Sequence, residues 1–464
     1  MSRKLWLFSV VISLGLFFVF ALDQAANGTS NDEWKELEKS FKKEYSSTDG
    51  QKSGAHRAAA VQKLTGADHP GLVKLMVNTV IPNELKNNDP VVVDLAEAAL
   101  GKLQNQEAIG ELINESKKGS KEIRVILINA LGKVNNDDTI KQLIDFVNDS
   151  DLNIICAALD ALARTRSDKA VEAAIKHLDN SKLPVVLSAI RYLGSLSDES
   201  KKETILNALR DRKEKEKKDE RLKRELADAI TRVSQTKPSS DQEGKSETVA
   251  MFYGIPIHNP IFVVDISMSM TMPMTRIETL KKELKQAIDG LAKRDEVFDI
   301  ITFGDKTNVW KGQMVPAKQY KDEAFKWIDN LRPEGFTNIY DALELALQGG
   351  TAGGKFTLIF TGSEKSKQEE ICLLTDGAPN RGKYIHPEDI INAVGVLNKT
   401  RKLKIHCIGI SIENRRTDVA GGGMGGDHSA GGATPPPPDN RPGMLVSEFL
   451  KQLAEKNNGV YIEK

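Results

Sequence analysis

Apolar residues between about Pro90 and Leu209 recur with a period of 31 residues. One series is Leu100, Leu131, Leu162 and Leu193, and a second with the same spacing is Ile113, Ile144, Ile175 and Leu206. Each unit contains two apolar faces at helical spacing, separated by polar turn residues, which predicts a pair of helices. A long coiled coil is excluded because the heptad is interrupted at every turn. One helix pair cannot bury its own apolar face, so the pairs are expected to stack into a solenoid.

This pattern resembles the short type of HEAT repeat. Weaker copies at 56–80 and 222–233 extend the expected all-α repeat region to residues 51–235. The next stretch, 236–252, is polar and contains the chain breakers Pro238 and Gly244, so we interpret it as a linker. The resemblance implies a scaffold whose surface has room for a partner of its own.

Residues 253–464 have a different pattern, in which short apolar runs alternate with helical ones. Such alternation predicts an α/β doubly wound, mostly parallel sheet covered by helices on both faces. The expected strands are 261–264, 298–303, 371–374, 405–410 and 460–462, and the expected helices are 277–292, 320–331, 339–347, 387–397 and 446–456. Sheets of this kind bind ligands at the carboxyl ends of their strands.

Short polar side chains follow the expected strands at these ends. Asp265, Ser267 and Ser269 come directly after the first strand in a D-x-S-x-S pattern. Thr337 precedes a helix, and Asp376 ends another apolar strand. The D-x-S-x-S pattern alone also fits an ordinary turn with a helix cap. The combination of three segments at one sheet edge is much more specific.

Their order and settings resemble the metal-ion-dependent adhesion site of von Willebrand factor type A domains, over Gly254 to Lys464. Among such domains, the sequence pattern most resembles that of inter-alpha-trypsin inhibitor heavy chains and their bacterial relatives. The resemblance implies a site for Mg²⁺, or for Mn²⁺ or Ca²⁺, in which the serines and Thr337 ligate directly and the aspartates act partly through water. A hard cation of this kind prefers oxygen ligands. An open coordination position is then expected to take an Asp or Glu carboxylate of a partner protein.

The first residues have the layout of an export signal. Arg3 and Lys4 precede an uncharged apolar run from Leu5 to Leu22, and Val19 and Ala21 supply the small residues of a cleavage site. We therefore interpret 1–21 as a signal peptide, or alternatively as a membrane anchor, and 22–50 as a polar tether. The expected location is exported: secreted, periplasmic or at the cell envelope.

Charge and motifs exclude several functions. Lysine plus arginine and aspartate plus glutamate both total 65, so no net field favours nucleic acid. Neither a phosphate-binding glycine loop nor a hydrolase motif occurs in a suitable setting, so no small-molecule substrate and no enzyme activity are expected. Two alternatives remain: a structural scaffold in which the metal only braces the loops, and a metal-assisted hydrolase with His386 as base, although an exposed loop histidine is the simpler interpretation of His386.

Two segments depart from the type A pattern. Residues 349–370 are longer than a typical connection and contain an apolar run that suggests an extra strand or hairpin. Residues 420–442 are rich in glycine and proline, a composition that cannot form a packed core.

Overall fold

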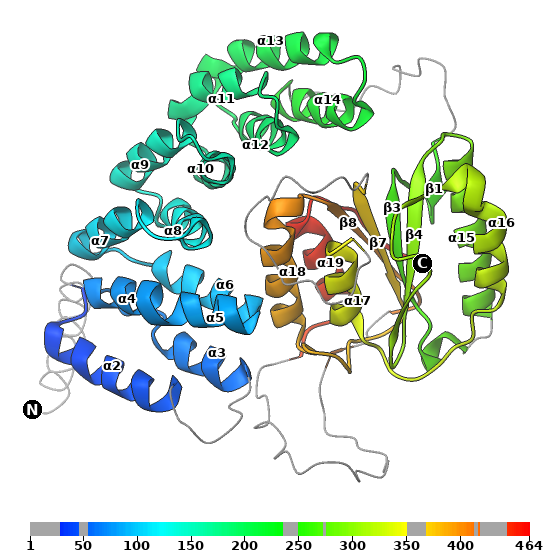
Figure 1. Ribbon diagram of the computed structural model, residues 1–464, viewed down its shortest axis with the longest axis horizontal. Coiled ribbons are helices and arrows are strands. Elements are labelled where there is room, and N and C mark those ends of the chain that lie inside the picture. The colour runs from blue at the N-terminus through cyan, green and yellow to red at the C-terminus, as the bar shows by residue number, and fades with distance from the viewer. Residues whose placement is uncertain are drawn as a thin grey trace, which may run out of the picture. The chain divides into compact units, whose positions relative to one another are not determined.

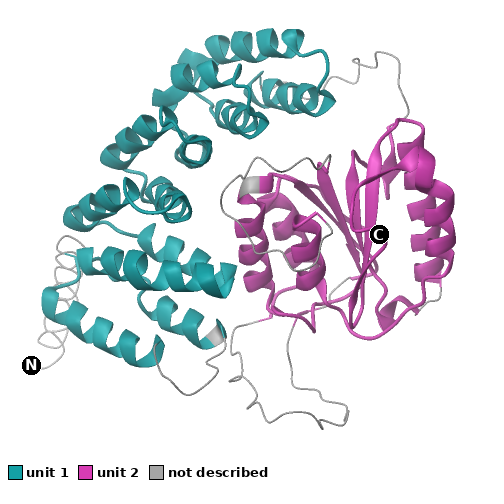
Figure 2. Cartoon of the chain, viewed as in Figure 1, with its two compact units in different colours: residues 1–238 teal, residues 239–464 magenta. Residues whose placement is uncertain are grey.

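The computed structural model describes residues 28–45, 54–234, 249–271, 275–349, 368–412, 416–417 and 443–464. The chain separates into two compact units, residues 1–238 and 239–464 (Figure 2). The expected signal segment, the expected strand within 349–370 and the insertion at 420–442 fall outside the described residues. Among the residues that are described, no helix has the length and apolar character needed to cross a membrane.

The first unit is built from helices throughout its described length (Figure 1). Its elements are α2 (Asn31–Tyr45), α3 (Gly54–Lys63), α4 (Pro70–Leu75), the π-helix η1 (Met76–Val80), α5 (Ile81–Asn87), α6 (Pro90–Leu100), α7 (Gln106–Ser116), α8 (Lys121–Val134), α9 (Asp137–Val147), α10 (Leu152–Thr165), the 3-10 helix η2 (Asp168–Ala170), α11 (Val171–His177), α12 (Leu183–Leu193), α13 (Glu199–Lys215) and α14 (Glu220–Ser234).

The 31-residue period sets the helix boundaries. Helices α6, α8, α10 and α12 begin at residues 90, 121, 152 and 183, and α7, α9, η2 and α13 begin at 106, 137, 168 and 199. Polar caps recur with the same period, since the side chains of Asp89, Ser120 and Asp151 each accept a backbone N–H in the first turn of the following helix. A cap of this kind stabilises a helix by about 1 kcal/mol. The sequence repeat is therefore a repeat of helix starts as well as of core residues.

Small residues after the core leucines allow neighbouring repeats to approach. A Cβ added at Gly132 would lie 2.7 Å from the Cβ of Ala161, and one at Gly101 would lie 2.6 Å from the Cβ of Lys133. Real Cβ atoms do not approach so closely, so the glycines set the spacing between successive helix pairs.

The expected polar tether at 22–50 is wrong for residues 31–45, which form α2. Trp34, Phe41 and Tyr45 are buried on one face of this helix, and Tyr45 Oη donates a hydrogen bond to Glu84 Oε1 at 2.5 Å. The three aromatic residues lie at helical spacing, but the charged residues between them give the stretch a polar composition. Composition therefore hid a helix that a periodicity search over a short window would have found.

The second unit is an α/β sandwich around one sheet. The strand order is β5-β4-β3-β7-β8-β9, with β6 paired to β4. Strands β3 (Pro260–Asp265), β4 (Val297–Phe303), β7 (Glu370–Thr375), β8 (Lys404–Gly409) and β9 (Tyr461–Glu463) run parallel, whereas β5 (Thr307–Val309) and β6 (Val315–Pro316) are antiparallel to β4. A short hairpin of β1 (Met251–Phe252) and β2 (Ile255–Pro256) precedes the sheet.

Helices cover both faces of this sheet (Figure 1). Helices α15 (Thr275–Ala292) and α16 (Ala317–Asp329) lie on one face, and α17 (Ile339–Leu347), α18 (Pro387–Arg401) and α19 (Val446–Lys456) lie on the other. Every residue of β3, β4 and β7 is buried, which explains why these strands are mostly apolar. After β3 the chain adds β4 on one side and later β7 on the other, so the strand order reverses at β3.

Candidate metal centre

The carboxyl end of β3 carries Asp265, which is fully buried. Its Oδ1 accepts the backbone N–H of Ser267 at 2.7 Å, and its Oδ2 accepts the hydroxyl of Thr375 at 2.5 Å. Burial raises the pKa of Asp265 to about 6, and the nearby charge of Asp376 also raises it, while the hydrogen bonds from Ser267 and Thr375 act in the opposite direction. A nearby cation would relieve this penalty.

The two serines of the D-x-S-x-S pattern connect this strand end to β7. Ser267 Oγ and Ser269 Oγ lie 2.9 Å apart, and Ser269 Oγ donates to Asp376 Oδ1 at 2.5 Å. Asp376 is fully buried, directly after the end of β7. Its second oxygen, Oδ2, accepts a hydrogen bond from Arg276 Nη1 at 2.8 Å, in an ion pair whose arginine side chain is 11% exposed.

Thr337 reaches the same edge from the loop before α17. Asn380 makes two hydrogen bonds to Thr337 of this loop. The side-chain Oδ1 of Asn380 accepts the backbone N–H of Thr337 at 2.7 Å, and the backbone N–H of Asn380 donates to the Thr337 carbonyl at 3.1 Å. A Cβ added at Gly377 would lie 3.8 Å from Thr337 Oγ1 and 3.9 Å from Ser269 Oγ. Gly377 therefore leaves space between the two hydroxyl groups.

All five sequence-predicted residues thus lie at one end of the sheet, at the reversal of strand order. The donor set is two carboxylates and three hydroxyls, which are ligands that Mg²⁺, Mn²⁺ and Ca²⁺ accept. Within the described ranges no three His, Cys, Asp or Glu side chains gather as a metal site, so any ion here depends on the hydroxyl groups. The space beside Gly377 and the convergence of the oxygens fit such an ion.

Three residues of the site were not singled out from the sequence: Arg276, Thr375 and Asn380. Thr375 and Asn380 lie one residue before and four residues after Asp376. Their closeness in sequence to a predicted ligand could therefore have identified them as candidate site residues. Arg276 also lies close in sequence to the D-x-S-x-S pattern, but its partner Asp376 is 100 residues further along the chain. The local sequence therefore does not predict this ion pair.

His386, the base considered for a hydrolase, is 7% exposed and precedes α18. The expectation of an exposed loop histidine is therefore wrong. Neither of its ring nitrogens has a hydrogen-bond partner among the described residues, and none of the hydrogen bonds at the candidate metal centre involves it.

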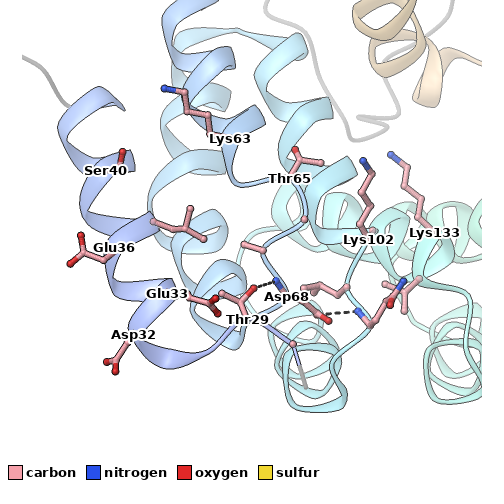
Figure 3. Close-up of a pocket in the computed structure, with 18 residues that line it drawn as sticks. Thr29, Asp32, Glu33, Glu36, Ser40, Lys63, Thr65, Asp68, Lys102 and Lys133 are labelled. Carbon is pink, nitrogen blue, oxygen red and sulfur yellow. Dashed lines mark hydrogen bonds between the residues drawn. The ribbon is translucent and has the colours of Figure 1, made fainter. Parts of the chain in front are cut away.

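A separate hollow of about 1430 Å³ lies in the first unit (Figure 3). One side carries acidic residues of α2, including Asp32, Glu33 and Glu36, and the opposite side carries Lys102 and Lys133, whereas Lys63 lies next to α2. Lys63 pairs with Glu44 at 2.8 Å and Lys133 with Glu97 at 3.1 Å, so two of the lysines already serve the packing of the helices. The mixed charge does not define one ligand class.

A mostly parallel sheet with helices on both faces and oxygen-bearing side chains at its reversal point defines a doubly wound α/β domain. Residues 259–417 match the von Willebrand factor type A domain family, and residues 109–194 match the HEAT repeat family. The chain therefore carries a von Willebrand factor type A domain preceded by HEAT repeats.

Curated relatives share the type A region. Inter-alpha-trypsin inhibitor heavy chain H4 of Bos taurus is 30% identical over 170 residues, which is 33% of this chain and 16% of the relative. Heavy chain H3 of Bos taurus is 32% identical over 149 residues, 31% of this chain and 16% of the relative. The match thus spans less than a fifth of the length of either relative.

Solved structures similar to this chain include BatB from Bacteroides thetaiotaomicron, at 18% identity and a TM-score of 0.29, covering 45% of this chain and 90% of that one. Proximal thread matrix protein 1 from the mussel byssus, also at 18% identity and a TM-score of 0.29, covers 45% of this chain and 43% of that one. The latter structure is described as having a zinc-occupied MIDAS motif.

Proposed function

We propose that the second unit binds a divalent cation and, through it, an acidic residue of a protein partner. Asp265, Ser267, Ser269, Thr337 and Asp376 would hold the ion, with Mg²⁺ as the expected occupant and Mn²⁺ or Ca²⁺ as substitutes. The single observation that carries the proposal is the hydrogen-bonded row from Ser267 through Ser269 to Asp376, because it joins two segments far apart in the sequence through ligand-type oxygens.

The chemistry follows from the charge of the site. When bound, the ion supplies a positive centre with a coordination position for an anion. The direct ligands are mostly neutral hydroxyls, which leave the ion electrophilic, and Arg276 offsets one of the two carboxylate charges. Two aspartates, one arginine and a divalent ion sum to one positive charge, which favours an incoming carboxylate over a neutral group.

The second unit is therefore a binding module and not an enzyme in this proposal, since the residues around the candidate ligands include no placed general base. We further propose that 1–21 directs export or anchors the chain, and that 51–235 is the repeat scaffold, whose surface binds a second partner. Residues 236–252 would link this scaffold to the binding unit, 253–464. The competing proposal is a scaffold in which the ion only braces the loops.

Two measurements test the proposal. Calorimetric titration of the full chain with MnCl₂ and MgCl₂ should give a single site, which Asp265→Ala abolishes and Asp329→Ala leaves unchanged. Asp329 is a suitable control because it ends α16 and its side chain is 61% exposed. Complexes formed with proteins of the native medium or envelope in magnesium should disappear with chelator and with Asp265→Ala. Complexes that survive both treatments would support the scaffold instead.

A further inference from the structure

The loops of the candidate metal centre also carry exposed apolar side chains. Only six large apolar residues are exposed among the residues that the structure describes, and two of them flank candidate ligands. Met268, 55% exposed, lies between Ser267 and Ser269, and Phe336, 53% exposed, precedes Thr337. We refer to Met268 and Phe336 as the apolar rim.

The fold brings the two residues of the apolar rim together from distant parts of the chain. Met268 N donates a hydrogen bond to the carbonyl of Gly335 at 3.1 Å, which joins the two loops next to Phe336. Asp305 holds the second loop, since its Oδ1 accepts the N–H of Phe336 at 3.0 Å. Gly335 has a φ of 65°, and a Cβ there would lie 2.1 Å from the Asp305 carboxyl carbon. Three independent features thus fix the backbone that presents Phe336.

A cation stands beside the apolar rim. The Arg381 guanidinium carbon lies 5.5 Å from the centre of the Phe336 ring. A cation over an aromatic face is held in place electrostatically. The Phe336 end of the apolar rim therefore carries a positive charge next to its ring.

We infer that the apolar rim selects the partner, and that its occupant is a polypeptide segment in which an Asp or Glu adjoins a large apolar residue. This rests on the proposed function, because the acidic residue is the one that the ion would take. The neighbouring apolar side chain packs on Met268 and Phe336, and the positive charge of Arg381 complements an acidic segment. Exposed apolar residues that adjoin a polar anchor point are typical of binding sites.

The test uses the full chain and a displayed library of peptides with the pattern Gly-Xaa-Xaa-Asp-Xaa-Xaa-Gly. Selection takes place in MnCl₂, and peptides are released with chelator. We expect Leu, Ile, Met and Phe to be enriched next to the fixed Asp. The Met268→Ser/Phe336→Ser double variant should lose this enrichment and bind the selected peptides at least about tenfold more weakly, since truncated anchor residues commonly cost that much. Its Mn²⁺ affinity, measured by calorimetry, should match that of the unchanged protein.

Val460→Ser is the matched control. Val460 is 47% exposed and precedes β9, the edge strand that β7 and β8 separate from β3, so it does not flank a candidate ligand. A selected pool without apolar enrichment, or enrichment that persists in the double variant, overturns the inference while leaving the proposed function in place. Self-association in sedimentation that the double variant abolishes also overturns it, because the occupant is then a second copy of the chain. The absence of any chelator-released peptide overturns the proposed function itself.

Discussion

Arg276 offers the sharpest test of the charge distribution at the metal centre. Its guanidinium donates to Asp376 Oδ2 at 2.8 Å, and the two side chains are 11% and 0% exposed. A cation so placed holds Asp376 in the metal-free protein and opposes the entry of a second cation. We therefore predict that Arg276→Gln destabilises the metal-free protein and strengthens metal binding.

The burial of the pair sets the magnitude. Breaking a buried ion pair by removing one partner costs about 3 kcal/mol, because the remaining charge is left uncompensated. The second unit is about 220 residues long, for which each 1 kcal/mol corresponds to a shift in Tm of roughly 2–4 °C, so the metal-free variant should melt roughly 6–12 °C lower. A divalent ion can compensate Asp376 in the variant, so part of this free energy should reappear as affinity for Mn²⁺. A gain of about 1.4 kcal/mol would be tenfold.

The assay combines thermal unfolding in chelator with calorimetric titration of Mn²⁺. Lys285→Gln is the control, because Lys285 pairs with Asp329 in an exposed position, with side chains 30% and 61% exposed, where an ion pair contributes about 0–1 kcal/mol. The reasoning is refuted if Arg276→Gln binds Mn²⁺ with unchanged or weaker affinity while its metal-free form is less stable.

Three further predictions follow from individual contacts. Asn380→Ala should weaken Mn²⁺ binding by about 10- to 100-fold, as loss of a residue that positions a ligand typically does. Asn380→Asp keeps the acceptor for the Thr337 N–H and should retain more affinity. Equal losses of Mn²⁺ affinity in the two variants would contradict the positioning role. The raised pKa of Asp265, about 6 against an ordinary 3.8, means that the metal-free fold binds a proton more tightly than the unfolded chain. The protonation of Asp265 therefore stabilises the metal-free fold more as pH falls from about 6 toward 4. Because the proton competes with the ion, Mn²⁺ affinity should fall below about pH 6. Calorimetric titrations between pH 5 and 8 that show no such fall would contradict this prediction. In the repeats, Gly132→Ala should destabilise the first unit by about 1–3 kcal/mol through overpacking against Ala161. Gly110→Ala, with open space around it in α7, should stabilise the first unit by about 0.5–1 kcal/mol. Denaturant unfolding measures both changes in the free energy of unfolding.

Much of this architecture could be predicted from periodicity. Both apolar series of the repeat region mark real helix pairs, because each pair must present a core face to the next at constant spacing. The five parallel strands of the second unit were equally readable, since a strand buried on both faces is mostly apolar, whereas the short strands β1, β2, β5 and β6 were not predicted. The helix at 31–45 was missed because three aromatic residues spread over twelve positions carry its buried face among charged neighbours.

The positions of the five candidate ligands at one end of the sheet could be predicted from the sequence, whereas their surroundings could not. Strand ends bring Asp265 and Asp376 together by topology alone, so the ordering of motifs along the chain was sufficient. The ion pair of Arg276 with Asp376 and the clasp of Asn380 on the Thr337 loop depend on side-chain geometry across about 40 to 100 residues. The burial of His386 likewise depends on packing that no local pattern reports.

The hydroxyl of Thr375 has a consequence for how the protein meets its environment. It gives Asp265 a hydrogen-bond donor, as Ser269 and Arg276 do for Asp376, so the acidic oxygens have partners of their own even before any ion arrives. Under the proposed function, we expect this unit to stay folded without its ion, unlike small domains that unfold when their zinc is removed. The unit would then gain and lose its cation as the surrounding concentration changes, and its affinity for a partner would follow the supply of divalent ions.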